Sequence, residues 1–480
     1  MNNIHNSLNN DVNSPILTPL MTGISSPDPL KFAFTVKSAP HAGRGGSHPL
    51  NLTPQQWQTW WTSPTSATQR ALYIHLPFCR KRCSFCNFFE NGSNPARISH
   101  YVDELSKQLY IASKTPFVQS GTFDTVYVGG GTPTDMQASE IAIIGEAIQA
   151  FPLAKDAEIT LEGRINGFTH AKFNAALCSG FNRFSFGVQS FDTQVRLAAG
   201  RFDDRETLIE RLQELSEHPS ATIVADLIFG LPGQTMEIWQ QDLQDVIQSG
   251  VHGVDLYQLI GLQGTRLSQQ AEKKATNKQK QQTLAPAVDS QTRASMYAAG
   301  ASLLESSNWQ RLSSCHWRQD KRERSIYNSL AKSGIEILPF GAGAGGNIHG
   351  HGIMNARDLS HWHQAQSQAT DTSIATDTLP SQVPGMIMSP NPSAALDSQF
   401  KAGLDSGVLA LANFDTELVS HLMPLFSAWK THGLVKISGK IMTQTLAGRF
   451  WNVNLQTGLF AYLKQNPFES CAIVAANKTP

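Results

Sequence analysis

The chain has 480 residues, and 40% of them are hydrophobic, which is enough to build a sizeable core. Its 38 Lys and Arg residues balance 38 Asp and Glu residues, so no net charge draws the chain to nucleic acid or to an anionic membrane surface. No run approaches the roughly 18 apolar residues of a membrane span. The N-terminus is polar and Asn-rich and does not resemble a secretory signal, so we expect a cytoplasmic protein.

Residues 1–65 contain few periodic segments and several helix breakers, which predicts an N-terminal extension that is partly disordered and ordered in its second half. From 66 to 362, short β-rich runs alternate with amphipathic segments, and we interpret this region as the core and its extension. The alternation predicts strand-helix-strand units with parallel strands, as in an open (β/α)6 barrel or a doubly wound sheet. The six runs are ALYIHL (71–76), FDTVYVGGG (123–131), EITLE (158–162), RFSFGVQ (183–189), TIVADLIFG (222–230) and GVDLYQL (253–259).

Two segments between these runs show apolar periodicity or capping residues that predict a helix. Residues from about 97 to 113 place apolar side chains on one stripe, namely Ile98, Tyr101, Leu105 and Leu109. Farther along, Thr235 is a candidate N-cap and Gly250 follows where a C-terminal cap belongs. The side chains between them that line one face are Met236, Trp239, Leu243 and Ile247.

The remaining segments complete the expected domain organisation. A Lys/Gln-rich stretch at 269–282 is expected to be a solvated helix or a disordered insert, with a ligand-binding segment as the alternative. A helix from about 290 and the sequence GAGAGG (341–346) extend the core, and a Thr/Ser/Pro-rich linker covers 363–393. At 394–480, a hairpin (LVKI, then Ser438 to Lys440, then IMTQ) and a helix with Leu446, Phe450, Trp451 and Leu459 predict a winged-helix-like lid domain. DNA binding is disfavoured because the chain has no basic surplus.

Three cysteines lie within eight positions, Cys79, Cys83 and Cys86. The spacing C-x3-C-x2-C lets one loop bring three thiolates to a 4Fe–4S cluster and leaves one iron without a protein ligand. The alternatives are a zinc site, which favours paired C-x2-C ligands, or three unrelated buried cysteines.

The sequence YIHLPFCRKRCSFC (73–86) resembles the signature of the radical S-adenosylmethionine superfamily, in its coproporphyrinogen-dehydrogenase-like branch. The likeness covers about residues 70–350 by ordered motifs and implies an open (β/α)6 partial barrel. It also implies that the open iron binds S-adenosylmethionine, whose one-electron cleavage gives a 5′-deoxyadenosyl radical. The resemblance assigns Cys79, Cys83 and Cys86 as cluster ligands, with Tyr73, His75 and Phe85 flanking the cluster.

Later motifs match the cofactor-contacting positions of that branch. VGGGTPT supplies Gly130, Gly131 and Thr132 to the methionine end of S-adenosylmethionine. The resemblance further implies contacts from the residues Glu162, Gln189, Arg201 and Asp226. A carboxylate such as Asp226 can accept both ribose hydroxyls, and Arg201 can pair with the methionine carboxylate. Taken singly, each of these residues is better explained by a surface ion pair or a strand-end cap, and it is their ordered occurrence that favours a cofactor site.

Within the branch, coproporphyrinogen dehydrogenases have another cysteine two residues after the third, where this chain has Phe88. Haem chaperones typically have E-x-N-P after the third strand, where this chain has Glu162, Gly163, Arg164 and Ile165. The sequences LEGRING, HAGRGG and LAGRFWNVNL are similar to the anaerobic haem-utilisation family of radical methyltransferases, the HutW/ChuW type. That likeness implies methyl transfer to haem with opening of the porphyrin ring, which releases iron and a linear tetrapyrrole.

The same likeness implies haem as substrate, a flavodoxin or ferredoxin as electron donor, and one or two molecules of S-adenosylmethionine. Tyr257, Gln258 and GAGAGG lie where a second molecule could pack, and Arg164 could pair with a haem propionate. A haem chaperone and an oxygen-independent coproporphyrinogen III dehydrogenase remain as alternatives.

Other reactive side chains are expected to be structural or solvated. Cys178, Cys315 and Cys471 are scattered and read as structural. The pairs His349/His351 and His361/His363 lie in Gly-rich and linker sequence, so a solvated position is expected, with ligation of a metal or of haem iron as the alternative.

Overall fold

The computed structural model describes residues 15–38, 45–86, 91–260, 265, 288–370, 379–380 and 382–468. These residues form two compact units. The core unit is Gly45–Ala402, and the second unit joins Met1–Arg44 to Gly403–Pro480. The insert at 269–282, Phe88 and Cys471 lie outside the described residues. No helix among the described residues is long and apolar enough to cross a membrane.

The core unit is built on a curved sheet in which, within the described residues, seven neighbouring strands run parallel. All six β-rich runs of the sequence form strands of this sheet, so the prediction of strand-helix-strand units is confirmed. The strands, in spatial order, are β12 (Glu336–Phe340), β2 (Arg70–Leu76), β5 (Phe123–Gly130), β6 (Leu153–Gly163), β7 (Arg183–Gln189), β8 (Thr222–Phe229) and β9 (Gly253–Gln258).

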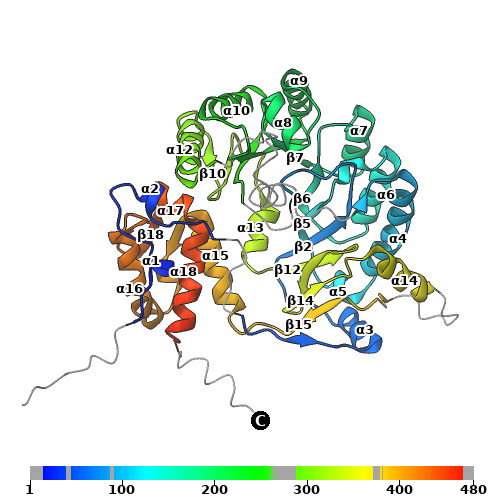
Figure 1. Ribbon diagram of the computed structural model, residues 1–480. Helices are drawn as coiled ribbons and strands as arrows, with labels where there is room; N and C mark the ends of the chain where they lie inside the picture. The colour runs from blue at the N-terminus through cyan, green and yellow to red at the C-terminus, as the bar shows by residue number, and fades with distance from the viewer. Residues whose placement is uncertain are drawn as a thin grey trace, which may run out of the picture. The chain divides into compact units, whose positions relative to one another are not determined.

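Helices cover the outer face of this sheet (Figure 1). The principal ones are α4 (Pro95–Ser113), α6 (Ala138–Gln149), α7 (His170–Cys178), α8 (Thr193–Ala199), α9 (Arg205–Ser216), α10 (Met236–Gln248) and α12 (Ser290–Ser306). The predicted stripe of α4 is confirmed, because Ile98, Tyr101, Leu105 and Leu109 are all buried. At the start of α10, the Thr235 side chain accepts a hydrogen bond from the Ile238 N–H, as its N-cap signal predicts.

Antiparallel strands extend the sheet at both edges, so it stays open. On one side lie β11 (His316–Arg318) and β10 (Gln310–Arg311), and on the other lie β13 (Gly345–Ile348), β14 (His351–Met354), β15 (Met386–Met388) and β1 (Pro49–Leu50). The arrangement is the open partial barrel that the sequence motifs imply. Shorter elements of the core unit are α3 (Pro54–Thr62), β3 (Phe78–Cys79), β4 (Asn91–Gly92), α5 (Pro116–Gln119), the 3-10 turn Pro133–Asp135, α13 (Ile326–Lys332) and α14 (Leu359–Thr370).

The structure differs from the expected linker at 363–393. Helix α14 runs into it as far as Thr370, and β15 lies inside it. Strand β15 pairs with both β14 and β1, and its central residue Ile387 is buried. A three-residue strand between Thr, Ser and Pro residues has no periodic signal of its own, because its partners come from distant parts of the chain.

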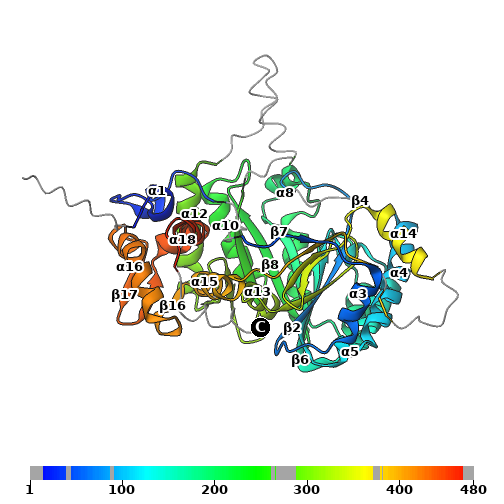
Figure 2. The same ribbon diagram turned by 90° about the horizontal axis from the view of Figure 1, so that it is seen from below.

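The second unit has helices packed on a small antiparallel sheet, which Figure 2 shows from below. The sheet order is β16 (Val408–Ala410), β18 (Ile441–Gln444) and β17 (Val435–Ser438). The predicted hairpin is confirmed, because Ser438 pairs with Ile441 across the turn at Gly439. The predicted helix after it is two helices, α17 (Leu446–Phe450) and α18 (Asn452–Gln465), joined at Trp451. The other helices are α1 (Pro19–Thr22), α2 (Pro29–Phe32), α15 (Ala394–Ser406), which begins in the core unit, the 3-10 turn Leu411–Asn413 and α16 (Thr416–Thr431).

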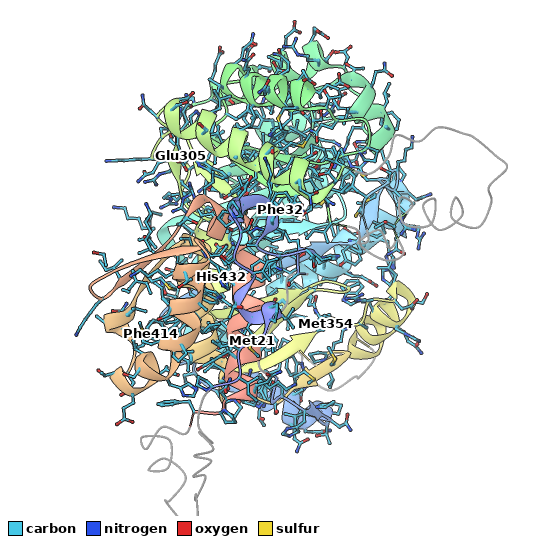
Figure 3. The ribbon with its side chains drawn as sticks, turned by 60° about the vertical axis from the view of Figure 1, so that its left-hand side comes forward. Met21, Phe32, Glu305, Met354, Phe414 and His432 are labelled. Atoms are coloured by element: carbon cyan, nitrogen blue, oxygen red, sulfur yellow. The ribbon has the colours of Figure 1, made fainter. Side chains whose placement is uncertain are left out.

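Residues 15–38 belong to this second unit and not to one extension covering 1–65. The Trp429 indole N–H donates to the Met21 carbonyl at 2.8 Å, and the Trp451 indole N–H donates to the Leu30 carbonyl at 2.9 Å. Figure 3 shows Met21 and His432 close together, and His432 Nδ1 lies 2.9 Å from the Thr22 carbonyl. Buried indole N–H groups need acceptors, and backbone carbonyls of the N-terminal segment supply them.

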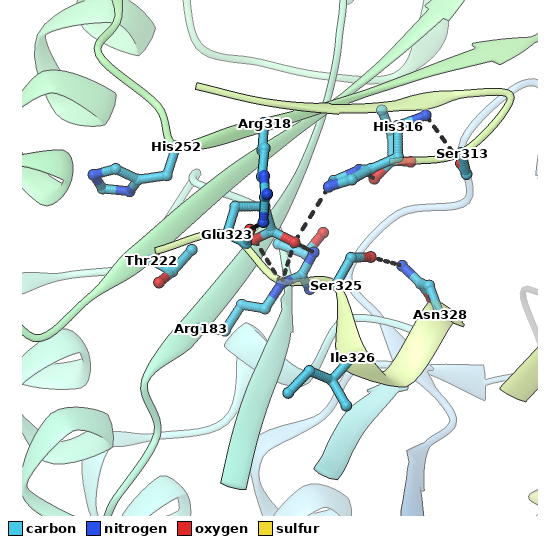
Figure 4. A network of polar contacts seen from close by, with 12 residues as sticks. Arg183, Thr222, His252, Ser313, His316, Arg318, Glu323, Ser325, Ile326 and Asn328 are labelled. Carbon is cyan, nitrogen blue, oxygen red and sulfur yellow. Dashed lines mark hydrogen bonds and ion pairs between the residues drawn. The ribbon is translucent and has the colours of Figure 1, made fainter. Parts of the chain in front are cut away.

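A buried polar network holds three strands of the core unit together (Figure 4). Arg183 on β7 donates to Glu323 Oε2 at 2.9 Å, and His316 on β11 lies 3.2 Å from Glu323 Oε1. The other nitrogen of His316 lies 2.8 Å from Asp255 on β9. Burial alone would lower the pKa of His316, but the Asp255 carboxylate and hydrogen bonds to both acids raise it to about 10. Burial would raise the pKa of Glu323, but Arg183 and His316 lower it to about 2.

Replacing Glu323 with Gln should lower the free energy of unfolding of the core unit by about 3–5 kcal/mol, because the Arg183 charge then stays buried without its counter-ion. Denaturant unfolding followed by circular dichroism measures this change. The matched control is Glu210→Gln, since Glu210 is exposed on α9. Equal unfolding midpoints for the two variants would contradict the role of the network.

The network also predicts a pH dependence of stability. The folded pKa of His316 lies above its ordinary value of 6.5, so its contribution is complete below pH 6.5 and is lost as the pH rises toward 10. The folded pKa of Glu323 lies below its ordinary value of 4.5, so its contribution is complete above pH 4.5 and is lost as the pH falls toward 2. The free energy of unfolding of a His316→Gln variant should not show the decrease between pH 6.5 and pH 10 that His316 causes in the wild type.

Candidate functional site

One pocket lies at the carboxyl ends of the central parallel strands, where barrel enzymes place their active sites. It brings together ten of the thirteen residues that the sequence motifs assign to the cluster and the cofactor. These are Cys79, Cys83, Phe85, Cys86, Gly130, Gly131, Glu162, Gln189, Arg201 and Asp226. The other three, Tyr73, His75 and Thr132, do not line it.

The three cysteines come from the loop that follows β2. Cys79 and Cys83 are buried and Cys86 is half-buried. The Thr132 hydroxyl donates to Cys79 Sγ at 3.3 Å, so Thr132 touches the cysteine loop from outside the pocket. Burial raises the pKa of the Cys79 thiol, and this hydrogen bond opposes the rise. Among the described residues no fourth cysteine and no histidine lines the pocket, which favours a cluster with one open iron over a closed zinc site.

Glycines after β5 let two backbone segments approach closely. The Gly131 N–H donates to the Leu76 carbonyl at 2.8 Å, and a Cβ at Gly131 would lie 2.4 Å from the Phe78 carbonyl oxygen. Gly130 has a φ of 114°, and a Cβ there would lie 2.6 Å from the His75 ring. Only glycine fits at these two positions, which leaves backbone groups at the pocket wall.

Arg201 presents an unbalanced charge to the pocket. Its side chain is buried, and Nε and Nη1 have no hydrogen-bond partner among the described residues. Burial lowers the pKa of Arg201, and the nearby Cys83 opposes this shift. A buried guanidinium with unpaired N–H groups fits an anionic ligand, and a carboxylate matches its fork geometry best.

Two carboxyl groups face the same pocket. Desolvation raises the pKa of Glu162 to about 7, although the Gly130 N–H donates to it. Desolvation, then the neighbouring Asp255 and Glu162, raise the pKa of Asp226 well above its ordinary range. The Ser185 hydroxyl donates to Asp226 at 3.2 Å. Carboxyl groups held in this way fit a ligand that offers hydrogen-bond donors or a positive charge.

The two remaining predicted residues of the lining, Gln189 and Phe85, are positioned by their strands and neighbours. Gln189 ends β7 at a break in the strand register and has a φ of 73°, a conformation that redirects its side chain. Phe85 packs against the buried apolar group Val195, Ile228 and Leu231. Both side chains line the pocket together with the three cysteines.

Tyr73 lies on β2, away from the pocket lining. Its hydroxyl is 2.8 Å from His75 Nδ1, and its ring stacks with Tyr127 and Tyr327 at 6.4 and 6.2 Å. Burial, with the Arg357 charge, lowers the pKa of His75 to about 4. His75 is therefore neutral at pH 7 and lies in hydrogen-bond contact with Tyr73.

Arg164 lines the pocket, as its position at a strand end predicts. Its Nη2 donates to Cys83 Sγ at 3.2 Å and to the Lys81 carbonyl at 2.8 Å. Sequence reasoning missed this contact with a cysteine, and it also missed Lys81, Arg82 and Gly187 as lining residues. The only signal was the basic sequence CRKRC around the first two cysteines.

A second pocket shares Arg164, Gly187 and Arg201 with the first. It adds the cationic side chains Arg80 and Arg196, with Asp203 as the acidic residue of its lining. The residues considered for a second cofactor lie elsewhere. Tyr257 and Gln258 end β9, and GAGAGG follows β12, so they lie at opposite edges of the parallel sheet and outside both pockets.

Comparison with known proteins agrees with this geometry. Residues 73–246 match the model of the radical SAM superfamily. The chain is 36% identical to anaerobilin synthase of Escherichia coli O157:H7 over 409 residues, which cover 84% of this chain and 87% of that protein. It is 31% identical to the heme chaperone HemW of Synechocystis sp. (strain ATCC 27184 / PCC 6803 / Kazusa) over 197 residues, which cover 40% of this chain and 47% of that protein.

Among solved structures, coproporphyrinogen III oxidase (HemN) from Escherichia coli has a similar fold. The TM-score is 0.67 with 21% sequence identity, and the match covers 85% of this chain and 94% of that chain. The chain belongs to the radical S-adenosylmethionine superfamily and, within it, to the family of anaerobilin synthase, as its motifs predict.

Proposed function

We propose that this protein opens the haem macrocycle without oxygen, by radical methyl transfer, and releases iron and a linear tetrapyrrole. The observation that carries the proposal is the likeness to anaerobilin synthase over 84% of the chain, which includes the whole pocket. The motifs LEGRING and LAGRFWNVNL support the same assignment.

The pocket residues fit a 4Fe–4S cluster and S-adenosylmethionine. Cys79, Cys83 and Cys86 would hold the cluster and leave one iron open. When bound, the cluster and S-adenosylmethionine supply one-electron cleavage of a carbon–sulfur bond. Arg201 has two unpaired nitrogen atoms among the described residues, which suits the methionine carboxylate of this cofactor.

The other predicted residues complete the proposed cofactor site. Glu162 is suited to the methionine ammonium group, and Asp226 to the ribose hydroxyls. Gly130 and Gly131 offer backbone groups, Thr132 acts through its hydrogen bond to Cys79, and Gln189 and Phe85 close the rim. Tyr73 is a positioning residue in this proposal, because its hydroxyl contacts His75 and not the pocket.

Haem would lie beside this site. The adjoining pocket is lined by Arg80, Arg164, Arg196 and Arg201. Arg80 and Arg196 pair with Asp135 and Asp203, so Arg164 is the arginine proposed to pair with a haem propionate. A second S-adenosylmethionine is the proposed methyl donor, and the placement of Tyr257 and Gln258 at the opposite sheet edge from GAGAGG does not support these segments as one site for it. A flavodoxin or ferredoxin is the proposed electron donor, and the cytoplasm is the proposed location.

A haem chaperone is the second candidate function, favoured by the 31% identity to HemW. It would bind and transfer intact haem. Coproporphyrinogen decarboxylation is disfavoured, because Phe88 stands where those enzymes have an additional cysteine.

The proposal predicts that cluster-loaded protein consumes haem in an anaerobic reaction with S-adenosylmethionine and a reductant. Loss of haem absorbance near 400 nm should accompany deoxyadenosine and an iron-free tetrapyrrole, both detected by mass spectrometry. Cys83→Ala should abolish all three signals, because it removes a cluster ligand, whereas Cys178→Ala should keep them, because Cys178 is exposed on α7. Intact haem with little deoxyadenosine, at full cluster content, would favour the chaperone.

The pKa of Glu162 predicts how cofactor affinity changes with pH. With a pKa of about 7, Glu162 is ionised in roughly one tenth of molecules at pH 6 and in roughly three quarters at pH 7.5. The positive charge of S-adenosylmethionine favours the ionised carboxylate, so its affinity for the protein should rise by up to about eightfold over this range. Equilibrium dialysis with protein that carries its iron-sulfur cluster measures this affinity at each pH. Glu162→Gln should bind more weakly and without this slope, and an unchanged slope would assign the titration to another group.

The contact between Arg164 and Cys83 predicts a change in the cluster's reduction potential. Replacing Arg164 with Gln removes a positive charge and an N–H···S hydrogen bond, so the potential should fall by on the order of tens of millivolts. Potentiometric titration followed by electron paramagnetic resonance measures the potential. Arg164→Lys keeps the positive charge, so its reduction potential should lie between those of the wild type and of Arg164→Gln. Equal potentials in all three proteins would show that Arg164 does not tune the cluster.

A further inference from the structure

Two histidines and one glutamate meet on the helices of the core unit, outside the pocket of the cysteines. His100 and Glu104 lie one turn apart on α4, and His363 lies on α14. Figures 1 and 2 both show α14 beside α4. One possible ligand atom from each of the three side chains lies within 4.8 Å of the other two.

The carboxylate of Glu104 connects the two imidazoles. Its Oε2 contacts His363 Nδ1, and its Oε1 lies 3.5 Å from His100 Nε2. The two imidazole rings stack at a centroid distance of 4.9 Å with an angle of 19° between their planes. The Glu104 side chain is only 14% exposed, and its two oxygens each reach a nitrogen of one ring.

The residues beside these ligands are firmly anchored. Tyr101 and Trp362 are fully buried, with ring centroids 4.5 Å apart. The Tyr101 hydroxyl donates to the His75 carbonyl and accepts from the Ala342 N–H, both at 2.8 Å. Tyr101 is the sequence neighbour of His100, and Trp362 is the sequence neighbour of His363. Their packing therefore fixes α4 and α14 at the spacing that brings His100, Glu104 and His363 together.

We propose that His100, Glu104 and His363 bind one divalent transition-metal ion, with Zn²⁺ as its probe. Imidazole nitrogens and a carboxylate oxygen are ordinary zinc ligands, and three of them leave a fourth position for water. Binding replaces the contact between Glu104 and His363 and draws the three ligand atoms to about 2 Å from the metal. The His100 side chain is 64% exposed and can rotate to do so.

The ion would fasten α14 to α4. Helix α4 in turn holds the backbone at His75 through Tyr101, and that backbone leads into the cysteine loop. The proposed ion therefore braces the frame of the site and takes no part in the reaction.

The structure places His361 and His363, which form one His-x-His pair in the sequence, in different surroundings. The side chain of His361 is 78% exposed and lies 3.7 Å from Asp358, away from the group formed by His100, Glu104 and His363. His361 is therefore the matched control for His363. His349 and His351 are half-buried, and their rings lie 6.1 and 4.5 Å from the Trp60 ring.

The test is Zn²⁺ binding to the cluster-loaded protein, measured anaerobically by titration calorimetry and by zinc content after gel filtration. Wild type and His361→Ala should each bind one equivalent in this site. His363→Ala and Glu104→Gln should bind at least tenfold more weakly. His100→Ala should also weaken binding. Of the three ligand variants it is the one least expected to disturb folding, because His100 is the most exposed of the three ligands. Iron content is measured in every sample, which separates zinc loss from loss of the cluster.

A second readout is the melting temperature of the same proteins. Zn²⁺ should raise it in wild type and in His361→Ala but not in His363→Ala, because only the first two can link α4 to α14. Equal zinc uptake by all variants, or no uptake by the wild type, would overturn the proposal. Loss of binding in His361→Ala alone would overturn it as well.

Discussion

The close approach of the Gly130–Gly131 turn to the Phe78–Cys79 backbone is the constraint on which the site depends. The Gly131 N–H bonds the end of β2 at Leu76, directly before the cysteine loop. No larger residue fits there, because a Cβ at Gly131 would lie 2.4 Å from the Phe78 carbonyl oxygen. This contact sets the start of the loop against the end of β5, and the carboxyl ends of the next strands supply the rest of the pocket wall.

Charge is the second organising feature of the molecule. Inside the sheet, Arg183, Glu323 and His316 pair with one another and fasten strands together. At the pocket, Arg201 keeps unpaired nitrogen atoms among the described residues, and the pKa values of Glu162 and Asp226 are raised. Buried charges that pair with each other stabilise the fold, whereas charges left without partners are expected where a ligand completes them.

Much of the core and of the pocket could be predicted from local sequence. The six strands and the stripe of α4 follow from periodicity, and the cysteines follow from their spacing. Strand β12 has no such signal, because Pro339 interrupts a five-residue run and its pairing with β2 spans distant sequence. The same limit applies to Met21 under Trp429, to Arg164 against Cys83 and to His363 beside His100, because each contact joins segments that only the folded chain brings together.

The most direct test of the proposed chemistry follows one carbon atom. Cluster-loaded protein is incubated anaerobically with haem, a reductant and S-adenosylmethionine that carries ¹³C in its methyl group, and the tetrapyrrole is analysed by mass spectrometry. The account predicts an iron-free, ring-opened product that contains the labelled carbon. An unlabelled opened product would contradict methyl transfer, and haem recovered unchanged in the presence of a reduced cluster would contradict ring opening altogether.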